Sequence, residues 1–94
     1  MDEFVARQLR QMCAKIADFR QGAIAFNDLI QQLESLARVI GQSFWEDSIF
    51  PLVVDLERIN SELIDKRRDM TIDERNEVEA IVTSIDSIAC DRLR

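Results

Sequence analysis

Residues 26–41, FNDLIQQLESLARVIG, carry the apolar pattern that decides the fold. The apolar side chains recur every three or four positions, as they do along one face of an α-helix. They are Phe26, Leu29, Ile30, Leu33, Leu36, Ala37 and Ile40. Gly41 follows the last of them, and glycine commonly ends a helix. The stretch therefore predicts an amphipathic helix whose apolar face has to be covered by other helices.

The same spacing continues through the rest of the chain. One apolar stripe covers residues 5–19 and is followed by Gly22, the only other glycine in the protein. A third stripe covers residues 45–63, and a fourth covers residues 78–93. Because each stripe has the three- and four-residue spacing of a helix, we expect four helices.

Two short motifs predict where the third and fourth helices begin. Residues 43–46 (SFWE) and 71–74 (TIDE) both match the capping box, in which the first and fourth residues bond each other's free backbone amides. Pro51 lies inside the third stripe, where it interrupts helical hydrogen bonding but not the apolar spacing. We expect one helix kinked near Phe50, and a break with Pro51 at the first position of a new helix is the alternative.

Short connections determine the predicted architecture. The stripes leave only about residues 21–24, 41–43 and 66–70 between helices, and short connections place consecutive helices antiparallel. The sequence therefore predicts one all-α domain over residues 1–94, an antiparallel up-down four-helix bundle with the third helix kinked or broken at Pro51. A three-helix arrangement with the third helix broken and a helical homodimer remain alternatives.

The composition excludes several classes of function. A chain of 94 residues has room for one domain, and a net charge of −6 argues against a general nucleic-acid binder, which needs a basic surface. There is no histidine, which Ser-His-Asp and Cys-His nucleophiles, Glu-x-x-His di-iron bundles and most catalytic zinc sites require. We therefore predict no catalytic residue, no cofactor and no metal site.

The two cysteines are expected to be reduced and separate. Cys13 lies in the first apolar stripe and is predicted to be a small core side chain, whereas Cys90 lies off the fourth stripe. A rise of 1.5 Å per residue puts them roughly 12 Å apart along the bundle axis, which is unfavourable for a disulfide. The sequence also shows no secretory signal pattern and no apolar run long enough for a membrane span. We expect a cytoplasmic protein.

The negative charge is concentrated in the second half of the chain. Residues 1–45 contain five acids and five bases, whereas residues 46–94 contain thirteen acids and seven bases. In an antiparallel hairpin these carboxylates would crowd one end and side of the bundle. Such runs are usually solvated faces, and the functional interpretation is a surface that meets a basic partner. The acids predicted to contact that partner are Asp47, Asp55, Glu57, Glu62, Asp65, Asp73 and Glu77.

Two apolar residues of the third helix fall outside its core stripe. At about 100° per residue, Phe50 and Val54 point away from the stripe and lie among charged side chains. An aromatic and a β-branched residue ringed by carboxylates resemble an interface anchor with a charged rim. Both therefore join the predicted partner-binding residues. The alternative is that the kink at Pro51 turns Phe50 into the core.

Two other functions fit parts of the pattern. Glu62-x-x-Asp65 and Glu74-x-x-Glu77 place carboxylate pairs one turn apart on neighbouring helices, an arrangement that suits Mg²⁺ in a nucleotide pyrophosphohydrolase. A helical adaptor or regulatory subunit is the other alternative, and it includes a homodimer built on a face of small residues in the fourth helix. Those small residues are Ala80, Thr83, Ser84 and Ser87.

The layout resembles a known group of bacterial proteins. Phe19-x-x-Gly22-x-Ile24 at the first turn, an apolar second helix and a third helix led by Trp45 are similar to immunity proteins of the colicin D type and of contact-dependent growth inhibition systems. The resemblance implies an antiparallel helical bundle that binds a cognate toxin nuclease domain in the cytoplasm. It also implies acidic side chains where the toxin would hold its tRNA. We expect a non-enzymatic protein, monomeric or homodimeric, without direct contact to nucleic acid or membrane.

Overall fold

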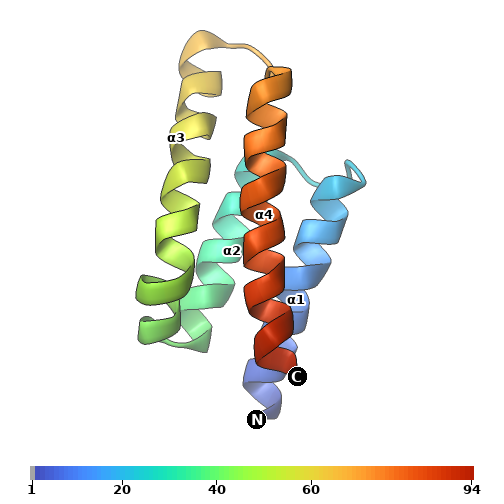
Figure 1. The fold of residues 1–94 in the computed structure, drawn as a ribbon, viewed down its shortest axis with the longest axis vertical. Helices are drawn as coiled ribbons and strands as arrows, with labels where there is room; N and C mark the ends of the chain where they lie inside the picture. The colour runs from blue at the N-terminus through green and yellow to red at the C-terminus, as the bar shows by residue number, and fades with distance from the viewer. Residues whose placement is uncertain (1) are drawn as a thin grey trace.

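The computed structural model describes residues 2–94 and is helical over most of that length. Its elements are α1 (Glu3–Arg20), α2 (Phe26–Ile40), the π-helical segment η1 (Phe44–Ile49), α3 (Phe50–Lys66) and α4 (Ile72–Leu93). The chain runs up α1, down α2, up through η1 and α3, and down α4 (Figure 1). The predicted all-α, up-down four-helix bundle is therefore confirmed. No helix within residues 2–94 has the length and apolar character needed to cross a membrane.

The core lies along the axis between the four helices. Helix α1 packs against α2 and α4, and α3 packs against the same two helices from the other side. The largest fully buried side chains are all apolar: Leu9, Met12, Ile16, Leu29, Leu33, Ile49, Leu56, Ile59, Ile85, Val53 and Val82. No polar or charged residue among residues 2–94 is buried. The fold thus depends on burial of the apolar stripes, which no single helix achieves alone.

The first connection ends α1 as the sequence predicts. Gly22 has a left-handed φ of 78°, which glycine adopts without strain. Its N–H donates to the Phe19 carbonyl at 3.0 Å, and the Ala23 N–H donates to the Asp18 carbonyl at 2.8 Å. These two bonds form a Schellman motif, which satisfies carbonyls left free at the helix end.

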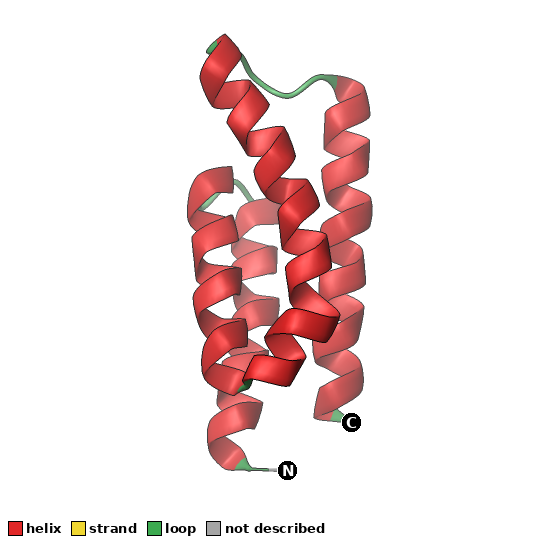
Figure 2. Ribbon diagram, turned by 90° about the vertical axis from the view of Figure 1, so that its left-hand side faces the viewer, coloured by secondary structure: helices red, strands yellow, loops and turns green. Residues whose placement is uncertain are grey.

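The hairpin of α3 and α4 extends beyond the connection between α1 and α2 (Figures 1 and 2). The end of α1 consequently lies beside the second turn of α4, where Arg20 contacts Glu79 at 2.8 Å. At the far end of the hairpin neither α1 nor α2 is available as a packing partner. Ile72, in the first turn of α4, is accordingly 77% exposed, and Ile64, on the side of α3 that faces away from the core, is 62% exposed.

Pro51 produces a kink through a wider turn of helix. Residues 44–49 form a π-helix, and the Phe50 N–H donates to the Trp45 carbonyl five residues earlier. A proline ring collides with the carbonyl four residues before it, so a regular α-helix is disfavoured at this point. The backbone stays helical from η1 into α3 while its direction changes (Figure 2). The structure therefore has the kinked helix that we expected, not a loop between two helices.

The π turn changes which aromatic side chains are buried. In a π-helix, residues five apart lie one above the other, so Phe44 lies over Ile49 and both are buried. Trp45 lies over Phe50 in the same way, and their ring centroids are 5.4 Å apart. The apolar stripe in the sequence begins at residue 45, so the burial of Phe44 was not predicted.

One of the two predicted capping boxes is present. The Thr71 hydroxyl accepts from the Glu74 N–H at 3.1 Å, and the Glu74 carboxylate accepts from the Thr71 N–H at 2.9 Å. The box at Ser43 is wrong: its backbone is already helical and its side chain makes no capping bond. The Trp45 N–H donates instead to the Gly41 carbonyl at 3.0 Å. An N-cap needs an extended residue, and helical geometry here begins before Ser43.

This difference between the two motifs gives a prediction about stability. Replacing Thr71 with alanine removes a real cap and should lower the free energy of unfolding by about 1 kcal/mol. The matched variant Ser43→Ala should stay within about 0.5 kcal/mol of the parent protein, because Ser43 caps nothing. Urea unfolding followed by circular dichroism measures both. Equal losses in the two variants would contradict the assignment of the caps.

Candidate functional site

An exposed stripe runs along the side of α3 that faces away from the core. Its members are spaced by four, three, four and three residues, which keeps them on one face of the helix. These residues are Phe50, Val54, Glu57, Ser61 and Ile64, with Asp65 beside the last of them. We call this set the outer face of α3. It combines three apolar side chains with two carboxylates and a hydroxyl.

The apolar members of the outer face are well exposed. Phe50 is 46% exposed, Val54 is 42% exposed, and Ile64 exceeds both. Phe50 packs against the ring of Trp45, which is buried, and the Arg38 guanidinium lies 4.9 Å from the centre of that ring. The sequence left open whether Phe50 lies on the surface or in the core, and the structure places it on the surface with Val54. A rigid aromatic base beneath an exposed aromatic ring is a suitable setting for an interface anchor.

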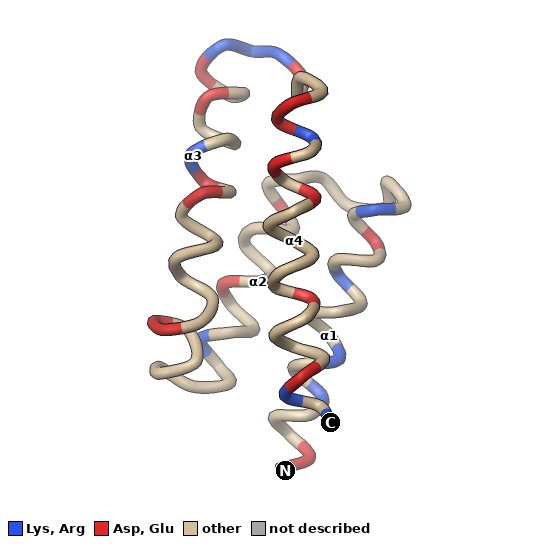
Figure 3. Tube along the Cα trace, in the orientation of Figure 1, with Lys and Arg blue, Asp and Glu red and all other residues tan. Residues whose placement is uncertain are grey.

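A second group of acids lies on α3 and α4, with basic residues between them in the sequence (Figure 3), and several of these acids form ion pairs along the seam between the two helices. Glu77 of α4 accepts from the Arg58 guanidinium of α3. Glu62 accepts from Lys66 at 3.1 Å and lies 4.0 Å from Arg68. Both predicted contact residues are thus already paired within the bundle. They contribute less free negative charge than the sequence indicates.

The strongest ion pair ties the α3–α4 connection to the start of α4. Arg68 donates to both oxygens of Glu74, at 2.7 and 3.0 Å. The Glu74 side chain is only 16% exposed. The Arg68 hydrogen bonds, followed by the bond from the Thr71 backbone amide, lower the pKa of Glu74 to about 2. This fork of two parallel bonds fixes the connection in one geometry.

The other predicted acids are exposed and have no ion-pair partner within residues 2–94. They are Asp47, Asp55, Glu57, Asp65 and Asp73. Glu57 and Asp65 belong to the outer face of α3, and Asp47 lies in the π turn before it. Asp55 stands two helical turns from Glu62, and Asp73 one turn from Glu77, so both lie toward the seam. The nine predicted residues therefore form two neighbouring groups, of which the outer face of α3 is the freer.

The carboxylate pairs considered for Mg²⁺ do not converge on one point. Glu77 is paired with Arg58, Glu62 with Lys66, and Arg68 lies between Glu62 and Glu74. Within residues 2–94, only Cys13, Asp86 and Cys90 gather three metal-ligating side chains in one place. A carboxylate held by a guanidinium has to lose that partner before it can bind a hard cation. The geometry at the seam therefore favours ion pairs over a magnesium site.

The two cysteines lie together, so their predicted separation was wrong. The Cys13 and Cys90 sulfur atoms are 3.9 Å apart across the seam between α1 and α4. The error comes from the axial offset of α4, which begins beyond the end of α1 and so brings its last turns beside the middle of α1. Both side chains are half-buried, so Cys13 lies at the edge of the core. Burial, the neighbouring Cys90 thiol and the Asp86 carboxylate raise the pKa of Cys13 to about 12.

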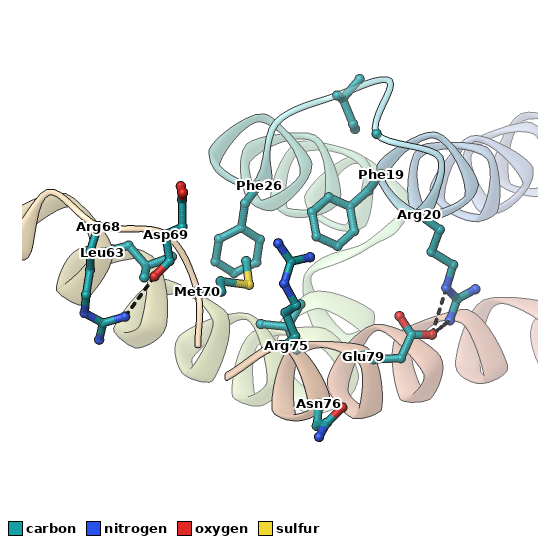
Figure 4. Close-up of a pocket in the computed structure, with 13 residues that line it drawn as sticks. Phe19, Arg20, Phe26, Leu63, Arg68, Asp69, Met70, Arg75, Asn76 and Glu79 are labelled. Atoms are coloured by element: carbon teal, nitrogen blue, oxygen red, sulfur yellow. Dashed lines mark hydrogen bonds and ion pairs between the residues drawn. The ribbon is translucent and has the colours of Figure 1, made fainter. Parts of the chain in front are cut away.

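A cleft of about 560 Å³ lies where the α1–α2 connection meets the start of α4 (Figure 4). The rings of Phe19 and Phe26, with centroids 5.8 Å apart, form its apolar wall. Figure 4 shows the Arg75 guanidinium extending toward them. Arg20 and Arg68, also at the cleft, are held by acids of α4. The sequence pattern did not reveal this cleft, because it forms only where the α3–α4 hairpin extends past the first two helices.

Four exposed apolar residues were not predicted from the sequence: Phe4, Val39, Ile64 and Ile72. A helical projection of α3 could have found Ile64, since it lies three positions from Ser61 on the same face. Ile72 gave no such signal, because it occupies the first turn of α4, where the packing depends on whether α1 reaches that level. Ile64 extends the outer face of α3 toward the end of the hairpin.

These surfaces carry the functional argument, because no protein-family model, curated protein or solved structure matches the chain. Among them, the outer face of α3 joins exposed apolar side chains to carboxylates that lack partners in residues 2–94. At the seam and the cleft most of the cations and acids are paired with each other. The outer face of α3 is therefore the strongest candidate site.

The Arg68–Glu74 pair gives a prediction about pH. A carboxyl whose pKa is lowered on folding stabilises the protein above its ordinary pKa of 4.5, and that contribution disappears as the pH falls toward 2. Glu74→Gln keeps a side-chain oxygen for the cap at Thr71 but loses the charge. The urea midpoint of the parent protein should exceed that of the variant at neutral pH, and the difference should shrink steadily below pH 4.5. A difference that stays constant down to pH 2 would contradict this role of the charge.

Proposed function

We propose that this chain is a non-enzymatic binding protein that docks a basic protein domain on the outer face of α3. The observation that carries the proposal is the exposed pair Phe50 and Val54 beside carboxylates without partners in residues 2–94. Exposed apolar side chains of this size are normally covered in a functional complex when they lie together with a polar rim. The apolar pair would supply the contact, and the acids would select the charge of the partner.

The electrostatics of the chain support a cationic partner. The net charge is −6, and the second half of the sequence contains all of the excess acids. Unpaired carboxylates on an exposed helix attract a basic surface and speed its approach. A nucleic acid does not fit this surface, because nucleic acids bind to basic protein surfaces. A basic protein is therefore the partner class that best fits the outer face of α3.

The specific form of the proposal is an immunity protein for a toxin nuclease. The resemblance of the sequence to colicin D and contact-dependent inhibition immunity proteins supports this form. A nuclease cleft is basic because its substrate is a polyanion. Carboxylates such as Glu57 and Asp65 would occupy positions that otherwise hold phosphates, and Phe50 would fill an apolar pocket at the rim. Inhibition would then result from steric block and charge neutralisation, with no covalent step.

The two acidic groups have different roles in this proposal. Unpaired acids, among them Glu57, Asp65 and Asp47, are ready to contact a cation directly. Glu62 and Glu77 are held by Lys66 and Arg58 and would first have to exchange partners. A charge at the rim of an interface mainly changes the association rate, whereas removal of one partner of a buried charge pair costs about 2–5 kcal/mol.

The proposal is tested with the protein encoded beside this gene. If the neighbouring reading frame encodes a large secreted protein, its C-terminal domain should co-purify with this chain as a stable complex and lose its toxicity. Phe50→Ala should then weaken binding about 30-fold or more, as expected for a central aromatic anchor. The matched control is Phe4→Ala on α1, because Phe4 is 45% exposed and Phe50 is 46% exposed. Equal affinities of the Phe50→Ala and Phe4→Ala variants for the partner would contradict the role of Phe50 as an anchor.

The acids give a second, kinetic prediction for the same complex. Glu57→Lys on the outer face of α3 should slow association and make it less sensitive to salt, because it reverses a charge that steers the partner. Asp28→Lys is the control, since Asp28 is an exposed acid of α2 without an ion pair in residues 2–94. Surface plasmon resonance at two ionic strengths measures both. Alanine effects below about 0.5 kcal/mol at every predicted acid would contradict the assignment.

The helical-adaptor alternative makes a different prediction about the free protein. Its homodimeric form uses the small residues of α4, which are exposed, although Thr83 accepts from Arg20 at 3.0 Å and Ser84 donates to the Ala80 carbonyl at 3.1 Å. Light scattering of the free chain separates the two functions. A monomer with an intact outer face of α3 favours the binding proposal, and a stable dimer that covers α4 favours the adaptor.

A further inference from the structure

Three metal-ligating side chains converge on the seam between α1 and α4, away from the outer face of α3. They are Cys13 of α1 and the pair Asp86 and Cys90 of α4, with ligand atoms all within 4.8 Å of one another. All three side chains are half-buried. We propose that they form a binding site for a thiophilic divalent cation, Zn²⁺ in a cell, that joins the first helix to the last.

The distance between the two sulfur atoms fits an ion. A tetrahedral zinc site has Zn–S bonds of about 2.3 Å, and two sulfurs bound to one zinc are therefore about 3.8 Å apart. The Cys13 and Cys90 sulfurs are 3.9 Å apart. A disulfide would need them to approach to about 2.05 Å. The spacing already present thus favours a shared ion over a covalent bond.

The presence of the Asp86 carboxylate distinguishes a metal site from a simple pair of thiols. Asp86 precedes Cys90 by four residues, so one helical turn brings its oxygen to the same face of α4. It has no cationic partner within residues 2–94. A half-buried carboxylate beside the two sulfur atoms completes a set of two sulfurs and one oxygen that suits zinc.

The number and location of the ligands suit a site with one open position. Three protein ligands leave the fourth tetrahedral position to water, and partial exposure of the cluster lets water reach it. Each thiol gives up its proton to solvent when the ion binds. Because the ligands come from α1 and α4, the ion would also hold the two ends of the chain together, and binding would favour the folded state.

The test is a titration of the reduced, full-length chain with Co²⁺, which reports thiolate ligands and tetrahedral geometry through its absorption spectrum. We expect one Co²⁺ per chain, a sulfur-to-cobalt charge-transfer band, visible bands of a tetrahedral site and displacement of the cobalt by Zn²⁺. Cys13→Ser and Cys90→Ser should abolish the charge-transfer band. Asp86→Asn should weaken Co²⁺ binding about tenfold or more. Asp91→Asn is the matched control, because Asp91 is an exposed acid on the same helix, and it should bind as the parent protein does.

Several results would overturn the proposal. One is the absence of thiolate bands when both thiols are free by chemical titration. Another is unchanged binding in Asp86→Asn, which tests the site without altering a residue that packs against the core. A cobalt ion bound between two chains, detected by native mass spectrometry, would reject a site within one chain. Loss of both thiols to a disulfide in air, with no metal bound by the reduced protein, would favour a covalent link instead.

Discussion

Pro51 is the constraint on which the shape of the candidate binding face depends. Proline has no backbone N–H, and its ring collides with the carbonyl four residues earlier, so a regular helix is disfavoured there. The chain widens into the π turn of residues 44–49 without leaving the helical path. That turn buries Phe44 and Trp45 together and leaves Phe50 supported from beneath by the Trp45 ring. The proposed anchor therefore stands on a packed helix and not on a loop, which limits the entropy it would lose on binding.

Pairing within the bundle decides how much of the acidic charge is available to a partner. Arg58, Lys66 and Arg68 all act on carboxylates along the seam of α3 and α4. The acids outside their reach, including Glu57 and Asp65, keep their full charge at the surface. Within residues 2–94, the seam keeps two acids without ion pairs, Asp55 and Asp73, whereas both acids of the outer face of α3 lack an ion pair. Only the outer face of α3 combines such acids with exposed apolar side chains, and electrostatic complementarity helps to fix the register of a complex.

The proposed binding surface and the proposed metal site share no residue and lie on different helices of the bundle. The cysteine cluster joins α1 to α4, whereas the outer face of α3 belongs to the helix that packs on α2 and α4. An ion bound at Cys13, Asp86 and Cys90 would raise the free energy of unfolding of the bundle. Contacts of Phe50 would contribute to the affinity for the partner. The two proposals can therefore fail independently, since neither requires the other.

Much of this fold follows from local pattern alone. Apolar spacing determines how each helix is rotated toward the core, which is why the four helices, the stop at Gly22, the cap at Thr71 and the outward position of Val54 were predicted correctly. Tertiary structure alone decided which carboxylates are neutralised and that Cys13 lies beside Cys90. The physical reason is that spacing within a helix carries no information about how far neighbouring helices are displaced along their axes, and here α4 begins beyond the end of α1.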